Sequence, residues 1–196
     1  MLTEQVPKPK IDLDPLFAQI RELKPEGTIW FGISGSWRKG SEEVETEVRR
    51  TVREVMERGG GIISGGALGV DYHATDEALK FDPTAERIKI FLPSILGLYA
   101  AHYRRRAGEG VITQEQAESL IAQLTQIKAA NPAALIEHPT NTEMNPATYY
   151  ERNTEVVKAS DAVLGFHVNE SGGVADTLQK AVEMGKPVAS IKYVIE

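Results

Sequence analysis

The sequence predicts an α/β fold built on a doubly wound, mainly parallel sheet with helices on both faces. Short apolar runs rich in β-branched residues alternate with longer segments whose apolar residues lie three and four positions apart. This alternation is typical of parallel strands joined by crossover helices, and all-apolar strands are typical of a sheet covered on both faces. We therefore expect a Rossmann-like fold, with strands at residues 28–34, 61–64, 87–92, 134–136, 162–166 and 187–195.

Helix start and stop signals lie between the expected strands. Ser41 can cap a helix that ends before the glycines at 59–61, and Thr113 with Gln116 forms a capping box. Pro146 favours another helix start, because proline suits the first helical position. The expected helices span residues 16–23, 41–58, 113–128, about 146–159 and about 173–184.

The length favours one domain, because a chain of 196 residues can close a single substantial core. We expect residues 1–25 to form an N-terminal lead, disordered or loosely docked over 1–12, followed by the short helix. Residues 26–196 then form a single Rossmann-like nucleotide-binding domain. The stretch from 94 to 132 is longer than one crossover helix requires, so we expect a two-helix insertion there.

The composition excludes several kinds of site. With no cysteine, the chain has no disulfide, no thiolate metal site and no cysteine nucleophile. Its four histidines, at 73, 102, 138 and 167, form no local zinc signature, so no metal and no cofactor are expected. No run of about 18 apolar residues and no signal peptide is present, so we expect a cytoplasmic protein without membrane contact.

The net charge of −6 disfavours nucleic acid as a partner, because the molecule as a whole repels a polyanion. The candidate basic patch is the run Arg104, Arg105 and Arg106, with Arg38 and Lys39 as further candidate members. A solvated helix face or a set of intramolecular ion pairs is the alternative interpretation of this run.

Three glycine-rich turns each follow an expected strand and precede an expected helix, where a doubly wound sheet binds its ligand. In the first turn, Gly35 allows close approach of the backbone, and the Ser34 and Ser36 hydroxyls can bind phosphate oxygens. Trp37 follows, and Arg38 can supply a bidentate cation. This turn matches neither the G-x-G-x-x-G nor the G-K-[ST] phosphate-binding pattern, and a purely structural turn would also explain it.

The second turn contains Gly65, Gly66, Ala67 and Gly69, and Asp71 lies at the start of the next helix. Three glycines in five residues allow successive backbone N–H groups to converge on an anion. Asp71 either complements the helix dipole or accepts a hydrogen bond from a ribose or a base.

The third turn, with Ser171, Gly172 and Gly173, opens the last expected helix. Ser171 and Thr177 can cap backbone N–H groups or contact phosphate, and capping is the favoured interpretation. Asp176 lies in the same helix. The pair Arg152 and Asn153 precedes the fifth strand, where Arg152 could clamp phosphate or form a surface ion pair.

The motif Gly65-Gly66-Ala67-Leu68-Gly69-Val70-Asp71, with His73-Ala74 and Ala78-Leu79, resembles the G-x-A-x-G-I-D-x-x-A-H-x-x-A-L pattern of DNA-processing protein A (DprA, also Smf). Arg152-Asn153, followed by Ser160-Asp161 and Ser171-Gly172, resembles the R-N segment and the later S-G loop of that family. The resemblance runs from about residue 30 to residue 195 and covers the 94–132 stretch worst.

The layout is also similar to the Lonely Guy proteins, the cytokinin-activating phosphoribohydrolases of the same SLOG superfamily. Their M-H-x-R-K segment corresponds to residues 149–153, and their P-G-G-x-G-T-x-x-E loop to about 172–180. Asp176 replaces a glycine of that loop, and Gln179 and Lys180 replace the carboxylates that follow. The resemblance implies a nucleotide-binding protein that forms a homodimer or a higher homo-oligomer, whereas the missing glutamate argues against the hydrolase activity.

The leading functional hypothesis is that a nucleotide or phosphorylated nucleotide derivative binds in a crevice at the carboxyl edge of the sheet. Arg38 and Arg152 would be the cations on its phosphate. An enzymatic alternative is cleavage of an N-glycosidic or phosphoribosyl bond, with Asp71 or Asp176 in place of the missing glutamate.

A second alternative is binding of single-stranded DNA. The run at 104–106 would contact phosphates, and Trp37, Tyr99 or Tyr103 would stack on the bases. The net charge argues against this alternative.

Overall fold

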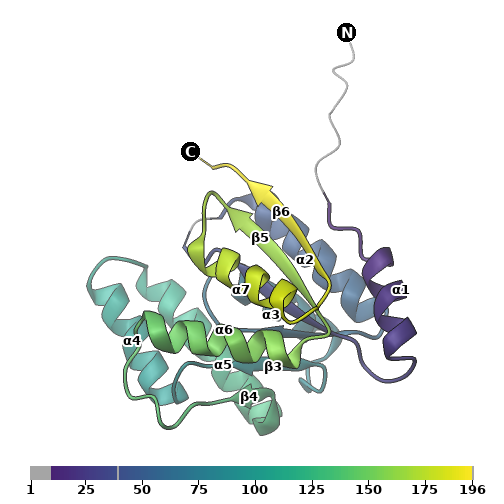
Figure 1. The fold of residues 1–196 in the computed structure, drawn as a ribbon. Helices are drawn as coiled ribbons and strands as arrows, with labels where there is room; N and C mark the ends of the chain where they lie inside the picture. The colour runs from purple at the N-terminus through teal and green to yellow at the C-terminus, as the bar shows by residue number, and fades with distance from the viewer. Residues whose placement is uncertain (1–9, 39, 196) are drawn as a thin grey trace.

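A computed structural model describes residues 10–38 and 40–195. Within them, a six-stranded parallel sheet has the order β4-β3-β2-β1-β5-β6 (Figure 1). The strand order reverses at β1, because β2, β3 and β4 follow on one side of that strand and β5 and β6 on the other. The expected doubly wound fold is confirmed. The strands are β1 (Trp30–Gly35), β2 (Gly61–Ser64), β3 (Ile88–Phe91), β4 (Leu135–Ile136), β5 (Ala162–Val168) and β6 (Val188–Tyr193).

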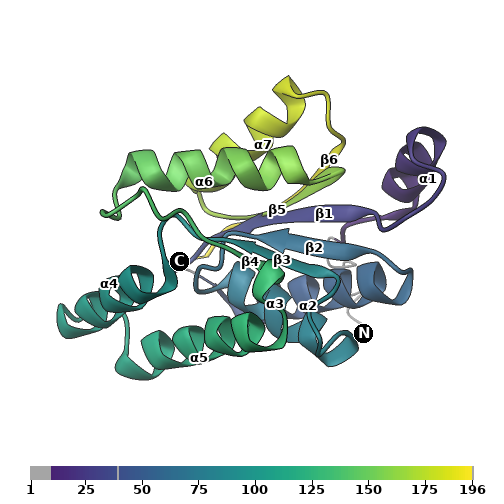
Figure 2. The same cartoon turned by 90° about the horizontal axis from the view of Figure 1, so that it is seen from below.

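Helices cover both faces of the sheet. Helices α6 and α7 lie on one face, and α2, α3 and α5 lie on the other (Figure 2). Helix α4 projects beyond the carboxyl edge, and with α5 it forms the two helices expected between residues 94 and 132. The bounds are α1 (Asp14–Leu23), α2 (Glu42–Glu57), α3 (Val70–Phe81), α4 (Leu96–Gly108), α5 (Gln114–Ala130), the 3-10 turn η1 (Pro132–Ala134), α6 (Pro146–Ala159) and α7 (Gly172–Glu183).

The expected caps begin their helices. The Ser41 hydroxyl accepts a hydrogen bond from the Val44 amide at 3.4 Å, and Thr113 with Gln116 forms the expected capping box of α5. Helix α6 also has a capping box, from Asn145 and Thr148, immediately around Pro146. These local bonds satisfy N–H groups that a helix leaves free at its first turn, which explains why the sequence locates these starts well.

The chain is docked on the core at Ile11, and residues 1–9 of the expected loose lead lie outside the described residues. Ile11 is buried, and its amide donates to the Glu47 carboxylate of α2 at 2.9 Å. The Phe17 ring of α1 packs on Phe31 of β1 with a centroid separation of 5.0 Å. Ile11 and Phe17 therefore join the core on the α2 side of the sheet, so the part of the expected lead at Ile11 is docked.

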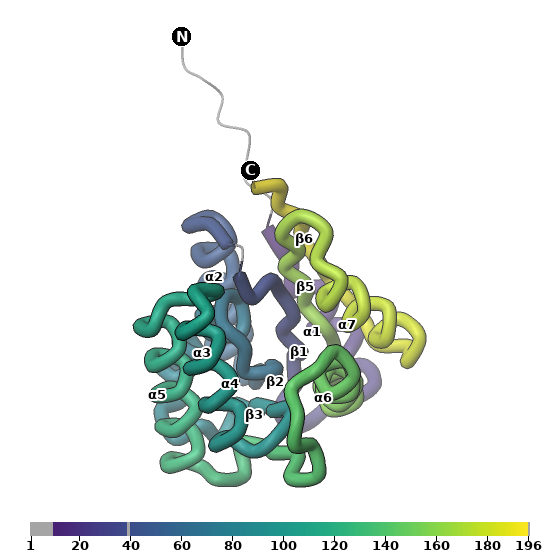
Figure 3. The backbone as a smooth tube through the Cα atoms, turned by 90° about the vertical axis from the view of Figure 1, so that its left-hand side faces the viewer, coloured from purple at the N-terminus to yellow at the C-terminus, as the bar shows by residue number. Residues whose placement is uncertain are grey.

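The core differs on the two faces of the sheet. Along β1, Phe31 and Ile33 are buried among the large apolar side chains that also line α2 and α3. On the opposite face, a methyl group at Gly32 would lie 2.5 Å from the hydroxyl oxygen of Ser160, which follows the last residue of α6, so β1 and the end of α6 pack closely. The starts of α6 and α7 lie near the carboxyl end of β1 (Figure 3).

Candidate functional site

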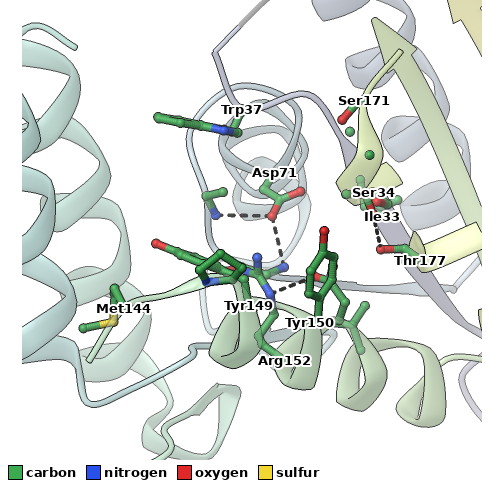
Figure 4. A pocket seen from close by; sticks show the side chains of 18 of the residues that line it. Ile33, Ser34, Trp37, Asp71, Met144, Tyr149, Tyr150, Arg152, Ser171 and Thr177 are labelled. Atoms are coloured by element: carbon green, nitrogen blue, oxygen red, sulfur yellow. Dashed lines mark hydrogen bonds between the residues drawn. The ribbon is translucent and has the colours of Figure 1, made fainter. Parts of the chain in front are cut away.

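A cleft of about 500 Å³ lies at the carboxyl edge of the sheet. Its walls come from the end of β1, the loop after β2 and helices α4, α6 and α7 (Figure 4). The three glycine-rich turns meet here, as expected for a crevice beside the strand where the sheet order reverses. Of the residues proposed from the sequence, the following line it: Ser34, Gly35, Trp37, Gly65, Ala67, Asp71, Arg152, Asn153, Ser171, Gly172, Gly173 and Thr177.

Five other proposed residues, Ser36, Arg38, Gly66, Gly69 and Asp176, do not line the cleft. The Arg38 guanidinium is exposed and lies over the Trp37 ring, 4.7 Å from its centroid. Asp176 accepts hydrogen bonds from Asn153 at 3.3 Å and from Lys180 at 2.8 Å, so it joins α6 to α7. The expectation that Arg38 and Asp176 face a ligand is therefore not met in this structure.

The positive-φ glycines of the second turn have packing roles. A side chain at Gly66, whose φ is 64°, would press against Ile90 and Leu92 of the core. At Gly69, with a φ of 71°, it would collide with the Ser36 carbonyl, whose oxygen accepts the Val70 amide at 3.2 Å. The clustered glycines here allow the first two turns to pack against each other.

Asp71 occupies the anion-binding position of the second turn. Its Oδ2 accepts the Gly65 amide at 3.1 Å and the Ala67 amide at 3.2 Å, while the Gly66 amide donates to Ser64. The convergent amides expected to hold a ligand anion therefore hold a carboxylate of the protein itself. This is a correction to the sequence interpretation, which treated the amides and Asp71 as separate parts of a site.

Asp71 and Arg152 are the buried charged groups of the cleft. Burial raises the pKa of the Asp71 carboxyl to about 6, while the nearby positive charge of Arg152 and the two amides act in the opposite direction. Arg152 is 8% exposed, donates to the Gly65 carbonyl and to Asn153, and lies 5.5 Å from the Tyr149 ring centroid. Among the described residues it forms no ion pair, so the alternative of a surface pair with Glu151 or Glu155 is wrong.

The start of α7 is open toward the cleft. Ser171 precedes the helix but its side chain makes no capping hydrogen bond within the described chain, and Thr177 donates to the Gly173 carbonyl instead. The favoured interpretation of both residues as caps is therefore wrong. No atom lies within 4 Å of the position that a Cβ would take at Gly172 or Gly173. The start of α7, which is the positive end of a helix dipole, therefore has open space beside Gly172 and Gly173, and both residues line the cleft.

Several lining residues were not proposed as ligand contacts from the sequence. They are Ile33, His102, Met144, Asn145, Pro146, Tyr149, Tyr150 and Val156, whereas Tyr103 and Arg106 also line the cleft but were proposed only as DNA contacts. Most come from α4 and from the start of α6, whose positions depend on tertiary packing. The usable signal was Tyr149, which lies three residues before Arg152 in the same expected helix, because residues three apart lie on one face of a helix.

A hydrogen-bonded chain orients Tyr149 at the edge of the cleft. Arg105 donates to Nδ1 of His102 at 3.1 Å, because a guanidinium can only donate, and Nε2 of His102 lies 3.4 Å from the Tyr149 hydroxyl. Burial lowers the pKa of His102, as do Arg105 and Arg106, so the neutral ring carries its hydrogen on Nε2. The Tyr149 oxygen then accepts from His102, and its own hydrogen remains available to the cleft.

The basic run of α4 is mostly neutralised by acidic neighbours. Arg104 forms two hydrogen bonds with Glu118, at 2.8 and 2.9 Å, and Arg106 pairs with Glu109 at 2.7 Å. Lys39, a further candidate member of the basic patch, lies outside the described residues.

The aromatic residues proposed for DNA stacking differ in their access to the cleft. Tyr99 is buried and donates to the Gly66 carbonyl at 3.1 Å, so it cannot stack on a base. Of the residues proposed for DNA contact, Trp37, Tyr103 and Arg106 reach the cleft.

Two further features concern metals and membranes. Across residues 10–38 and 40–195, no group of three His, Asp or Glu side chains is arranged to hold a metal ion. The helices in these ranges are all too short or too polar to cross a lipid bilayer.

No protein-family model and no curated protein matches the sequence. Solved structures do. DNA processing protein A from Helicobacter pylori, described with its single-stranded DNA binding mode, superposes with a TM-score of 0.60 at 21% identity over 83% of this chain. The chain shares the Rossmann-like fold of that protein. It spans 64% of that DprA chain.

Two proteins named for binding or carrying the molybdenum cofactor have a similar fold. The molybdenum cofactor binding protein from Rippkaea orientalis has a TM-score of 0.55 at 16% identity, covering 85% of this chain and 78% of that one. The molybdenum cofactor carrier protein from Chlamydomonas reinhardtii has a TM-score of 0.52 at 13% identity, covering 85% and 79%. Structures of this fold are therefore named for more than one ligand class, and the ligand of this chain must be argued from the cleft.

Proposed function

We propose that this protein binds a nucleotide or a phosphorylated nucleotide derivative in the cleft at the carboxyl edge of the sheet. The observation that carries the proposal is the uncapped start of α7, which opens into a cleft that also contains a buried arginine. Free amides at a helix start bind anions, and phosphate is the commonest anionic group that such turns bind.

The phosphate end of the proposed site is the start of α7. Gly172 and Gly173 leave open space around their backbone, so phosphate oxygens can reach the amides without displacing a side chain. Ser34, at the end of β1, lies on the same side of the cleft as Ser171 (Figure 4). Arg152 contributes a positive charge that forms no ion pair within the described chain, and a guanidinium pairs well with phosphate.

The opposite end of the cleft suits a flat heterocycle. Trp37 lies on one side of the cleft and Tyr149 on the other, with Met144 at the end (Figure 4). Aromatic rings provide stacking surfaces for a base, and thioether groups adapt to its outline. The volume of about 500 Å³ is in the usual range for small-molecule sites.

Isothermal titration with nucleoside monophosphates, dinucleotides and sugar nucleotides tests the proposal. The molybdenum cofactor belongs in the panel, because two structural neighbours are named for it. A dissociation constant in the micromolar range for one member is expected, with binding weakened by inorganic phosphate. If the folded protein binds nothing in the panel, the proposal is wrong.

A matched pair of variants localises the anion site. Gly173 and Gly97 are each the second residue of a helix, and neither has an atom within 4 Å of the position that a Cβ would take, but only Gly173 lines the cleft. An acidic residue near a helix start favours the helix, so both G173D and G97D should fold. We expect G173D to lose binding by like-charge repulsion and G97D to retain it. Equal binding by both variants would refute phosphate contact at α7.

An enzymatic function is the second candidate, because Asp71 is the one carboxylate among the described residues that line the cleft. Its raised pKa of about 6 would suit a proton acceptor near neutral pH. Incubation with nucleoside monophosphates followed by chromatography tests this candidate. Release of a free base that D71N abolishes would support it, and absence of released base would leave binding alone.

Single-stranded DNA binding has less support. The basic run of α4 is paired with Glu109 and Glu118, and Tyr99 is buried. The net charge is −6. A mobility-shift experiment at low salt, where electrostatic binding is strongest, should show no complex.

A further inference from the structure

Asp71 retains an unused hydrogen-bond acceptor in the wall of the cleft. The residue is 6% exposed, and both hydrogen bonds that it accepts from Gly65 and Ala67 go to Oδ2. Within the described part of the chain, Oδ1 has no hydrogen-bond partner. Because Asp71 lines the cleft, a bound molecule can reach Oδ1, and a hydrogen bond donated to this charged oxygen adds affinity.

The position of Asp71 indicates which part of a ligand it meets. In Figure 4 it lies between Ser34 and Ser171 on one side and Met144 on the other. These are the phosphate end and the heterocycle end of the proposed site. In a nucleotide, the sugar lies between the phosphate and the base.

The charges around Asp71 disfavour a charged partner and favour a neutral donor. A phosphate oxygen only accepts hydrogen bonds at neutral pH, so a carboxylate repels it. A cationic group is disfavoured because Arg152 already supplies positive charge beside Asp71, and the start of α7 adds a positive dipole end. A sugar hydroxyl is a neutral donor that meets neither penalty.

We propose that Oδ1 of Asp71 accepts a hydrogen bond from a sugar hydroxyl of the bound nucleotide, so that the cleft selects ribonucleotides over deoxyribonucleotides. This inference rests on the proposed function. Arg152 has the supporting role of balancing the charge of the carboxylate. Asp71 therefore accepts hydrogen bonds from the second turn through Oδ2 and from the ligand through Oδ1.

Titration calorimetry at pH 7.5 tests the selection with the unmodified protein. The probes are AMP, GMP, CMP and UMP, each compared with its 2′-deoxy and 3′-deoxy counterparts. We expect the removal of one hydroxyl to weaken binding about tenfold or more, the loss typical of a hydrogen bond to a charged group. Equal affinity for the ribonucleotide and both deoxy analogues overturns the inference, while the proposed function stands.

The variant D71N gives a second readout. Its amide oxygen can still accept from Gly65 and Ala67, which leaves its NH₂ group facing the position of Oδ1. A sugar hydroxyl can accept a hydrogen bond from this group, but the bond no longer has a charged partner, so D71N should discriminate against the deoxy analogue less strongly than the wild type does. Discrimination as strong in D71N as in the wild type would assign it to another residue. If no nucleotide binds the wild-type protein at all, the proposed function and this inference both fail.

Discussion

Replacement of Asp71 by asparagine should change how the stability of this protein depends on pH. Burial raises the pKa of this carboxyl from its ordinary value of 3.8 to about 6 in the folded state, against the lowering effect of Arg152 and the two amides. The folded protein therefore binds the Asp71 proton more tightly than the unfolded chain does. Asparagine carries no such proton.

The sign and size of the effect follow from this shift. Because the folded-state pKa is raised, the Asp71 contribution to stability is greatest below about pH 4 and is lost as the pH rises through about 6. Between pH 5 and pH 8 the integrated loss is about 1.4 kcal/mol in the free energy of unfolding. D71N lacks this loss, so its stability relative to the wild type should rise by the same amount over that interval.

Urea unfolding of both proteins at pH 5, 6, 7 and 8 measures the difference directly. D14N serves as the control for loss of a surface carboxylate, because the Asp14 side chain is 82% exposed. The relevant quantity is how the difference in the free energy of unfolding between D71N and the wild type changes with pH. A difference that is the same at pH 5 and pH 8, or that decreases, would refute the reasoning that burial dominates the environment of Asp71.

Three further predictions concern the cleft and its surroundings. In G65A the new methyl group would overlap the Arg152 guanidinium, so the arginine must move. Calorimetry should therefore show weaker nucleotide binding, and unchanged affinity would mean that Arg152 does not contact the ligand. In G173A the new methyl group meets no neighbouring atom, and alanine favours helix over glycine by about 0.5–1 kcal/mol. Urea unfolding should therefore show an equal or higher free energy of unfolding, and a clear loss would contradict an open helix start. R104A removes an exposed ion pair with Glu118, so the melting temperature and the nucleotide affinity should both stay at the wild-type values. A reduced affinity would mean that Arg104 takes part in nucleotide binding.

Much of the fold could be predicted from the sequence because its determinants are local. The strand-to-helix alternation, the capping box at Thr113 and Gln116 and the glycines after the strands all depend on residues close together in the chain. The end of β5 differs from the expectation, since it continues to Val168 through His167, a polar residue that the apolar pattern did not include. Pairing with β6 on its far side supplies the backbone hydrogen bonds that extend it.

The sequence by itself determined that three glycine-rich turns would lie at one edge of a parallel sheet, because parallel strands bring their carboxyl ends together. Only the tertiary structure decided what each turn does there. Asp71 folds back onto the amides of Gly65 and Ala67, so the second turn is already occupied, while the start of α7 stays open. Sequence patterns cannot distinguish these outcomes, because whether a backbone amide is free depends on which side chain reaches it in three dimensions.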